Sequence, residues 1–271
     1  MAVGVWYNSI MKVFPVLFVL VLGVGVLGAQ SPERSGGEGF SITPPPRGYG
    51  SYSRDPAANR HRAELSWHYL ETDLYTLQGG SLYITSRLFR RSWGGLSLQY
   101  GGFYLQGEET AAIMTKKDGS WGSDQDEETD LRVSGFGVAP TLEVVLWGST
   151  EAGSERSRRA QLLGFAGFDG GHQFFSQDLG EGWENYYSRY AAPLAGVQLH
   201  LPLGGLLISP FGMYKHLYGQ SLYNGTTHDF DIALASGGVD LLWRGISVSG
   251  IVQALDDRSD RTYTLSVGFS F

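Results

Sequence analysis

The most regular pattern of apolar and polar positions lies at the end of the sequence. From Tyr263 to Phe271 every second side chain is apolar, and small or polar residues lie between them. Successive side chains of a β-strand point to opposite sides, so this alternation predicts a strand with one apolar and one polar face. The apolar positions are Tyr263, Leu265, Val267, Phe269 and Phe271.

Nine further segments after residue 62 are predicted to be strands, separated by residues that favour turns. In the clearest of them the apolar face carries Leu65, Leu98, Phe136 or Val248. In the second, fifth and seventh segments both alternating sets of positions contain apolar residues, so the inward and outward faces cannot be assigned. In the eighth segment, Gly237-Gly238 is predicted to shift the alternation by one residue, as a β-bulge would. The ten predicted strands lie near 63–74, 81–90, 95–106, 131–147, 160–169, 189–201, 205–216, 229–242, 245–255 and 261–271.

The predicted connections alternate in length along the chain. Short ones occur at 91–94, 202–204 and 243–245, whereas 148–159 is long where a short turn is expected. The remaining connections are expected to be external loops. This alternation predicts an up-and-down barrel with an even strand number. Ten strands are expected. One alternative is a barrel of eight strands in which residues 63–90 are not part of the wall. The other is a soluble protein, either a β-sandwich or a lipocalin-like barrel. The predicted external loops are 71–80, 107–130, 170–188, 217–228 and 256–260.

The start of the chain predicts export. Lys12 precedes an uninterrupted apolar run over 13–29 that ends in small residues, which is typical of a secretory signal peptide over 1–29. Met11 is an alternative start, and an uncleaved anchor is the alternative interpretation. Residues 30–62 are rich in Pro, Gly and Ser and are predicted to form a flexible periplasmic segment.

Composition narrows the class of protein. The chain has 39 Gly, 13% aromatic and only 17% charged residues, against about 25% in average soluble domains. The absence of cysteine excludes disulfides, a lipoprotein anchor and thiol chemistry. The net charge of −7 argues against a nucleic-acid partner. No later segment is long enough for a membrane helix, so a membrane-spanning form would have to be a closed barrel.

The last strand resembles the C-terminal signature of bacterial outer-membrane β-barrel proteins, in which alternating apolar residues precede a terminal Phe. The resemblance also covers the signal peptide and the strand pattern. It implies an all-β, transmembrane, antiparallel up-and-down barrel over 63–271 in the outer membrane of a diderm, Gram-negative bacterium, of the small OmpW or OmpX type. It implies outer-membrane lipid, periplasmic chaperones and the barrel assembly machinery as partners. That machinery would read Tyr263, Leu265, Val267, Phe269 and Phe271.

The polar face of such a barrel points into its lumen. There, polar side chains either form a hydrogen-bonded plug or line a narrow path. No cofactor or metal is expected. By parity, the lumen-lining candidates are Glu64, His68, Gln99, Glu143, Gln198, His200 and Asp231.

Catalysis finds little support in the sequence. Residues 228–231 combine His and two Asp at a strand rim, which resembles part of the site of omptin proteases, but no matching acidic pair is found. A lipid A deacylase would need His-X-Ser, which the chain lacks. The acidic run 124–130 is interpreted as a solvated loop.

The sequence therefore predicts a non-enzymatic barrel that offers a narrow channel or uptake path to small or hydrophobic solutes. The alternative is a barrel whose external loops bind an extracellular ligand or host molecule. An outer-membrane protease or lipid-modifying enzyme ranks third.

Overall fold

The computed structural model describes nine stretches of the chain, and none of them belongs to the predicted signal peptide. Most of the predicted loop 107–130, with the acidic run up to residue 128, also lies outside the described residues. Among the described residues, no helix is both long and apolar enough to cross a membrane. The described stretches are 44–46, 61–72, 75–91, 93–109, 129–148, 160–178, 183–223, 226–255 and 261–271.

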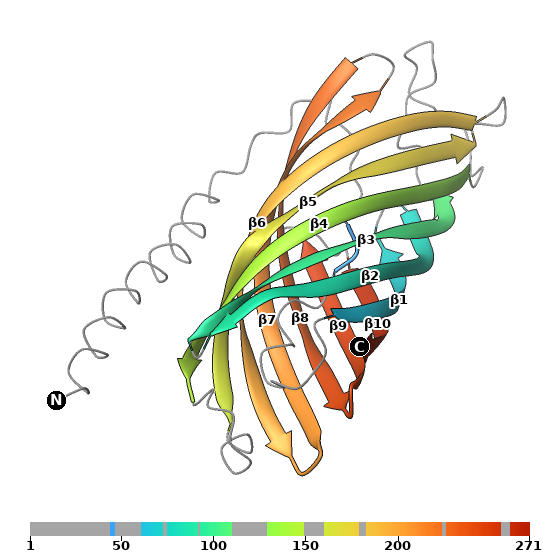
Figure 1. Ribbon diagram of the computed structural model, residues 1–271. Coiled ribbons are helices and arrows are strands. Elements are labelled where there is room, and N and C mark those ends of the chain that lie inside the picture. Colours follow the sequence, from blue (N-terminus) through green and yellow to red (C-terminus); the bar gives the residue numbers. More distant parts are fainter. Residues whose placement is uncertain are drawn as a thin grey trace. The chain divides into compact units, whose positions relative to one another are not determined.

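The described chain folds into ten β-strands, and each predicted strand has its counterpart (Figure 1). The strands form one antiparallel sheet in which β1 pairs with β2 on one side and with β10 on the other. The sheet is therefore a closed barrel. In chain order the strands are β1 His61–Glu71, β2 Tyr75–Arg91, β3 Gly94–Glu109, β4 Thr129–Trp147, β5 Gln161–Asp178, β6 Trp183–Leu203, β7 Leu206–Tyr223, β8 Thr226–Trp243, β9 Ile246–Leu255 and β10 Arg261–Ser270.

Closure of the sheet confirms the prediction of an all-β, ten-stranded antiparallel barrel. The eight-strand alternative is wrong, because β1 and β2 pair with each other and with their neighbours along the wall. His61 and Phe271 lie together at one end, where their backbones exchange hydrogen bonds of 3.2 and 2.9 Å. We call this end, with the turns at 204–205 and 244–245, the basal end, and the opposite end the distal end.

The two faces of the wall differ in chemistry. In β10, Leu265 and Phe269 are 56% and 53% exposed on the outer face, whereas Ser266 and Thr264 are buried on the inner face. The same alternation exposes Leu65 and Phe136 on β1 and β4. A barrel that is soluble in water would bury its apolar face, so this arrangement argues against the soluble alternatives.

Several strands continue far beyond their predicted ends. The predicted loops 71–80, 170–188 and 217–228 are mostly strand, because β2 begins at Tyr75, β5 and β6 continue to a connection at 179–182, and β7 and β8 are joined at 224–225. The sequence suggested loops there because Gly, Gln and Asp interrupt the apolar alternation. Cross-strand pairing nevertheless continues through these polar residues, and β5 to β8 reach past the distal ends of β9 and β10 (Figure 1).

The predicted bulge at Gly237-Gly238 does not occur. The ladders on both sides of β8 run through these residues without a register shift. Gly238 is needed on the inner face because a Cβ built there would be 2.9 Å from the Phe211 ring and still closer to the Gly250 carbonyl oxygen. The register shifts of the described ladders instead lie near the basal end, between Arg87 and Phe89 and between Val145 and Trp147.

Candidate functional site

The candidate site is the lumen, whose wall is polar toward the basal end. Inward-facing positions of the strands near that end carry charged, amide and hydroxyl side chains that are almost completely buried. Some of them pair with one another, as charges and hydrogen-bonding groups must when they leave water, whereas the Glu143 Oε1, Gln198 Oε1 and Ser247 Oγ atoms are buried and accept or donate no hydrogen bond among the described residues. The buried polar residues of this basal layer are Arg62, Glu64, Gln99, Glu143, Gln161, Gln198, His200, Ser209, Asp240, Ser247 and Ser249.

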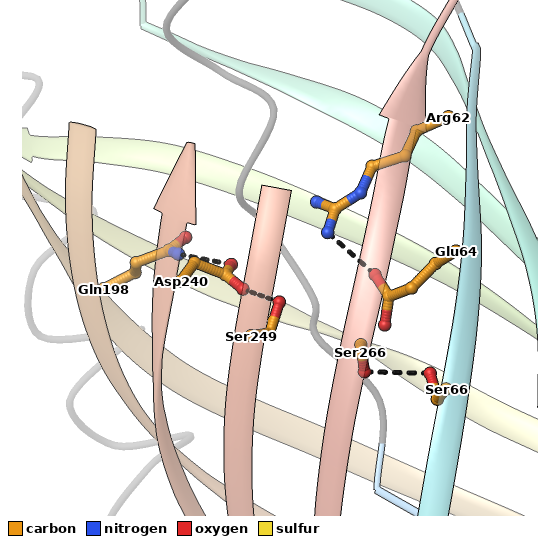
Figure 2. Close-up of polar contacts among 7 residues, drawn as sticks. All are labelled: Arg62, Glu64, Ser66, Gln198, Asp240, Ser249 and Ser266. Carbon is orange, nitrogen blue, oxygen red and sulfur yellow. Dashed lines mark hydrogen bonds and ion pairs between the residues drawn. The ribbon is translucent and has the colours of Figure 1, made fainter. Parts of the chain in front are cut away.

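Two carboxylates and one guanidinium form the centre of this layer. Arg62 Nη2 lies 2.9 Å from Glu64 Oε2, and both side chains belong to β1. Three strands along the wall, Asp240 of β8 accepts hydrogen bonds from Ser249 Oγ and, at 3.5 Å, from Gln198 Nε2. Figure 2 shows these groups pointing into the same interior space. Arg62 attracts Glu64, whereas Asp240 is near enough to repel it.

A third buried carboxylate lies on another part of the wall. Glu143 of β4 is 4% exposed and interacts electrostatically with Arg87 and Arg90 of β2. On the neighbouring strands, His200 is paired in register with Gln161. The basal layer therefore balances acidic and basic groups around the lumen and does not present one sign of charge.

The middle of the lumen contains further polar contacts. His68 Nδ1 lies 2.8 Å from Thr264 Oγ1, and its Nε2 lies 2.8 Å from Ser81 Oγ, so one imidazole joins β10, β1 and β2. Lys215 of β7 lies 3.4 Å from Asp169 of β5, and both side chains have no exposed surface. These contacts tie non-adjacent strands together through the interior.

The distal part of the lumen contains a large apolar cluster beside buried polar residues such as Gln173 and Gln177. Nine inward-facing side chains from β1 to β6 pack into one buried cluster, which we call the distal cluster. Outside, the same strands carry polar or interfacial residues at the alternating positions, such as Tyr104, Gln106 and Arg132. The wall is thus inverted toward this end, with its apolar side chains inside. The distal cluster consists of Leu70, Tyr75, Leu77, Phe103, Leu105, Leu131, Val133, Phe175 and Tyr186.

The structure places six of the seven predicted lumen residues inside the barrel. Glu64, His68, Gln99, Glu143, Gln198 and His200 are each at most 4% exposed. Glu64 and Gln198 share the group around Asp240, whereas His68 belongs to the middle contacts.

Asp231 does not lie with the other six. Its side chain is 56% exposed on the outer face of β8, where it pairs with His216 of β7. The reason is the uninterrupted register of β8: with no bulge, residues of the parity of Ser236 and Asp240 face inward, and Asp231 has the other parity. Asp229 is also outside and accepts a 2.9 Å hydrogen bond from Gln220.

Sequence reasoning missed four buried charged residues of the lumen: Arg62, Asp169, Lys215 and Asp240. Asp169 and Lys215 lie in strands to which no face could be assigned, because the lumen itself is partly apolar. A signal was present in the case of Asp240, which shares the parity of Ser236 if β8 is taken as a continuous strand. Among the described residues, no group of three or more His, Asp or Glu is arranged to hold a metal ion.

Comparison with known proteins gives similarities of fold at low sequence identity. No family model and no curated protein matches the sequence. Among solved structures, the translocator domain of the autotransporter NalP from Neisseria meningitidis is 9% identical, with 80% of this chain and 90% of that chain covered and a TM-score of 0.46. The outer-membrane protease OmpT from Escherichia coli is 9% identical, with 79% and 94% covered and a TM-score of 0.40. Ail from Yersinia pestis is 14% identical, with 78% and 96% covered and a TM-score of 0.36.

Proposed function

We propose that this chain is an integral outer-membrane β-barrel that offers small hydrophobic or amphipathic solutes a narrow path. The apolar outer face supports the membrane location, because lipid is the environment that favours it. A membrane needs strands of about 9–11 residues. β9 and β10, with 10 residues each, match that length, whereas β6, with 21 residues, exceeds it. In this proposal the basal end is periplasmic, and the distal ends of the long strands stand outside the membrane.

Assembly partners form part of the same proposal. Periplasmic chaperones would carry the exported chain, and the barrel assembly machinery would recognise the outward side chains of the closing strand. Those side chains, at alternate positions from Tyr263 to Phe271, are 38–59% exposed on the outer face of the barrel. No catalytic role is proposed, because Asp229 and Asp231 face outward, away from the enclosed lumen.

The observation that carries the proposed path is the distal cluster. A barrel wall standing in water needs no apolar residues inside unless they fill space or receive an apolar group. Here Leu77, Leu105 and Val133 lie inside the end that would face the exterior, above a basal layer of paired polar groups. An apolar solute entering there would exchange water for hydrocarbon before it meets the polar layer.

Uptake of a fluorescent apolar probe, N-phenyl-1-naphthylamine, by cells with an intact outer membrane tests this function. Cells expressing the protein should accumulate the probe faster than cells with an empty vector. Leu105→Asp should lower that gain roughly tenfold, because a hydrated carboxylate in the distal cluster would make the entry of an apolar probe less favourable by about 1.4 kcal/mol. Leu105→Ala should raise it by removing side-chain volume.

Gln106→Asp is the matched control, since Gln106 is the adjacent residue and is exposed on the outer face. It should leave uptake unchanged. All variants are first compared by heat-modifiability on gels to show that the barrel has formed. Equal probe uptake with and without the wild-type protein would rule out the path.

A second function is favoured by an outward aromatic group on β5 and β6. The rings of Phe174 and Tyr187 are 5.7 Å apart, those of His172 and Tyr187 are 5.4 Å apart, and His172 Nδ1 lies 2.7 Å from Tyr187 Oη. Aromatic side chains are common energetic centres of binding surfaces. A surface-binding role predicts that Phe174→Ser with Tyr187→Ser abolishes cell adhesion to extracellular-matrix-coated plates without altering probe uptake.

A further inference from the structure

Three consecutive prolines precede the first strand of the barrel in sequence but lie inside the barrel in space. Residues 44–46 belong to the segment that the sequence predicts to be a flexible linker, yet all three are buried. The carbonyl oxygen of Pro44 accepts a hydrogen bond of 3.5 Å from Gln253 Nε2, across 209 residues of sequence. The contact lies within one structural unit, because 44–46 cluster with the barrel.

Gln253 shows that this contact is on the lumen side of the wall. Its side chain has no exposed surface, whereas its neighbour Val252 is 44% exposed on the outer face. Ser236 Oγ donates a 3.2 Å hydrogen bond to Gln253 Oε1, which turns the amide nitrogen toward the interior. The donor that meets Pro44 is therefore held in place by a second residue of the wall.

The chemistry of the two partners fits. Proline has no backbone N–H, and a polyproline segment makes no hydrogen bonds within itself, so its carbonyl oxygens need external donors when they are buried. A buried glutamine amide whose oxygen is already satisfied supplies such a donor. The ring methylenes of proline can pack against apolar side chains. The lumen at this level offers both kinds of surface, with Ser236 and Thr262 beside Gln253 in register and Leu70 next to Thr262.

We propose that residues 44–46, here named the proline plug, close the lumen of their own barrel at the level of Gln253. As a closure of the solute path, this inference rests on the proposed function. The plug is distal to the polar layer: Gln253 is near the distal end of β9, and Ile246 is at its basal end. The seven residue steps between them rise about 23 Å. The sequence from 47 to 60 can extend over roughly 50 Å, so it is long enough to join the plug to His61 at the basal end.

Cross-linking in full-length protein tests the position of the plug. The chain has no cysteine, so any disulfide that forms must join the two introduced cysteines. Pro44→Cys with Gln253→Cys should form an intramolecular disulfide on mild oxidation. Pro44→Cys with Ser247→Cys is the matched control, because Ser247 is also buried on the lumen face of β9 but lies near its basal end. Equal cross-linking of the two pairs would overturn the proposal.

Ion conductance in planar bilayers tests the closure. Replacing all three prolines by glycine should raise the open fraction, because glycine removes the preorganised backbone and the ring packing. Gln253→Leu removes the donor at similar volume and should raise the open fraction roughly fivefold, the effect of losing about one hydrogen bond. Variants that match the wild-type conductance, although the Gln253 cross-link forms, would also overturn the proposal.

The two proposals fail in distinguishable ways. If conductance rises in the glycine variant but apolar-probe uptake never exceeds the empty-vector level, the plug stands and the hydrophobic path is wrong. If uptake depends on the distal cluster but Pro44→Cys does not cross-link preferentially to Gln253→Cys, the path stands and the plug is wrong.

Discussion

At the scale of single residues, inward aromatic rings lie over glycines of the neighbouring strand. A Cβ built on Gly135 would be 2.6 Å from the Phe103 ring, and one built on Gly238 would be 2.9 Å from the Phe211 ring. Phe165 covers Gly196 in the same way. Each ring fills the space that a side chain would occupy, and a backbone carbonyl oxygen of the strand on the other side lies within 2.7 Å of the same point, so these positions accept only glycine unless ring and backbone both shift. The pairs hold adjacent strands in one register.

Gly238→Ala is therefore expected to destabilise the barrel. The added methyl group must displace the Phe211 ring and the backbone of β9, and overpacking of this kind costs about 1–3 kcal/mol. Urea-induced unfolding of the protein refolded in lipid vesicles measures the change in the free energy of unfolding.

Gly237→Ala provides the control for this measurement. The methyl group there would meet its nearest atom, the Phe211 carbonyl oxygen, at an ordinary 3.6 Å. Its effect on stability should be small. Equal destabilisation by the two substitutions would show that backbone freedom, not the ring contact, makes glycine necessary in β8.

At the scale of the elements, strands of unequal length divide the wall into two zones. β9 and β10 have 10 residues each, whereas β4 to β8 have between 18 and 21. The short strands set the height of the membrane-spanning band, and the long ones add a distal zone. In that zone the outer face changes to residues such as Arg132, Arg189 and Gln220.

The same substitution at two heights should separate these zones. Leu265→Arg, in the middle of β10, places a cation in lipid and should cost about 2–4 kcal/mol of unfolding free energy, whereas a charge beyond the interface costs about 0–1 kcal/mol. Leu222→Arg is the control, because Leu222 is 46% exposed near the distal end of β7, a value close to the 56% of Leu265. Unfolding in vesicles measures both, and a large loss at Leu222 would place the distal zone inside the membrane.

At the scale of the whole molecule, closure depends on the seam between β1 and β10. The register runs from Arg62 opposite Ser270 to Glu71 opposite Arg261, and the His61 and Phe271 backbones continue it. Inside, Ser66 and Ser266 join across this seam at 2.8 Å (Figure 2). Because the backbone atoms make the ladder, the Phe271 side chain is not needed to close the barrel. Its ring is 59% exposed.

Phe271→Ala should therefore separate assembly from stability. Refolding into detergent or vesicles should proceed as in the wild type, because both backbone hydrogen bonds to His61 remain. In cells, the amount of protein in the outer membrane should fall several-fold if the assembly machinery reads this side chain. Quantitative blotting of outer-membrane fractions measures it. Wild-type levels in the membrane would show that Phe271 carries no assembly signal.

Much of the barrel could be predicted from the alternation alone. Where the outer face is uniformly apolar and the inner face polar, as at Leu265 and Ser266, the polarity of each residue predicts which face it lies on. The prediction failed where this contrast is lost. β5 and β7 face a lumen that is apolar in part, so Phe165 and Met213 on the inner face look like outward residues in the sequence. The distal strand ends are polar outside and therefore looked like loops.

The residues of the candidate site also differ in whether local alternation or long-range pairing places them. The sequence by itself determined which parity of β1, β3, β4, β6, β9 and β10 faces inward, because period-two geometry is local to a strand. It therefore found Glu64, His68 and Gln198. Only the tertiary structure decided the register of β8, which placed Asp240 in the lumen and Asp231 outside. It also decided the contacts of Lys215 with Asp169 and of Pro44 with Gln253. Those contacts join residues far apart in the chain, and they depend on strand register and closure, which no short stretch of sequence encodes.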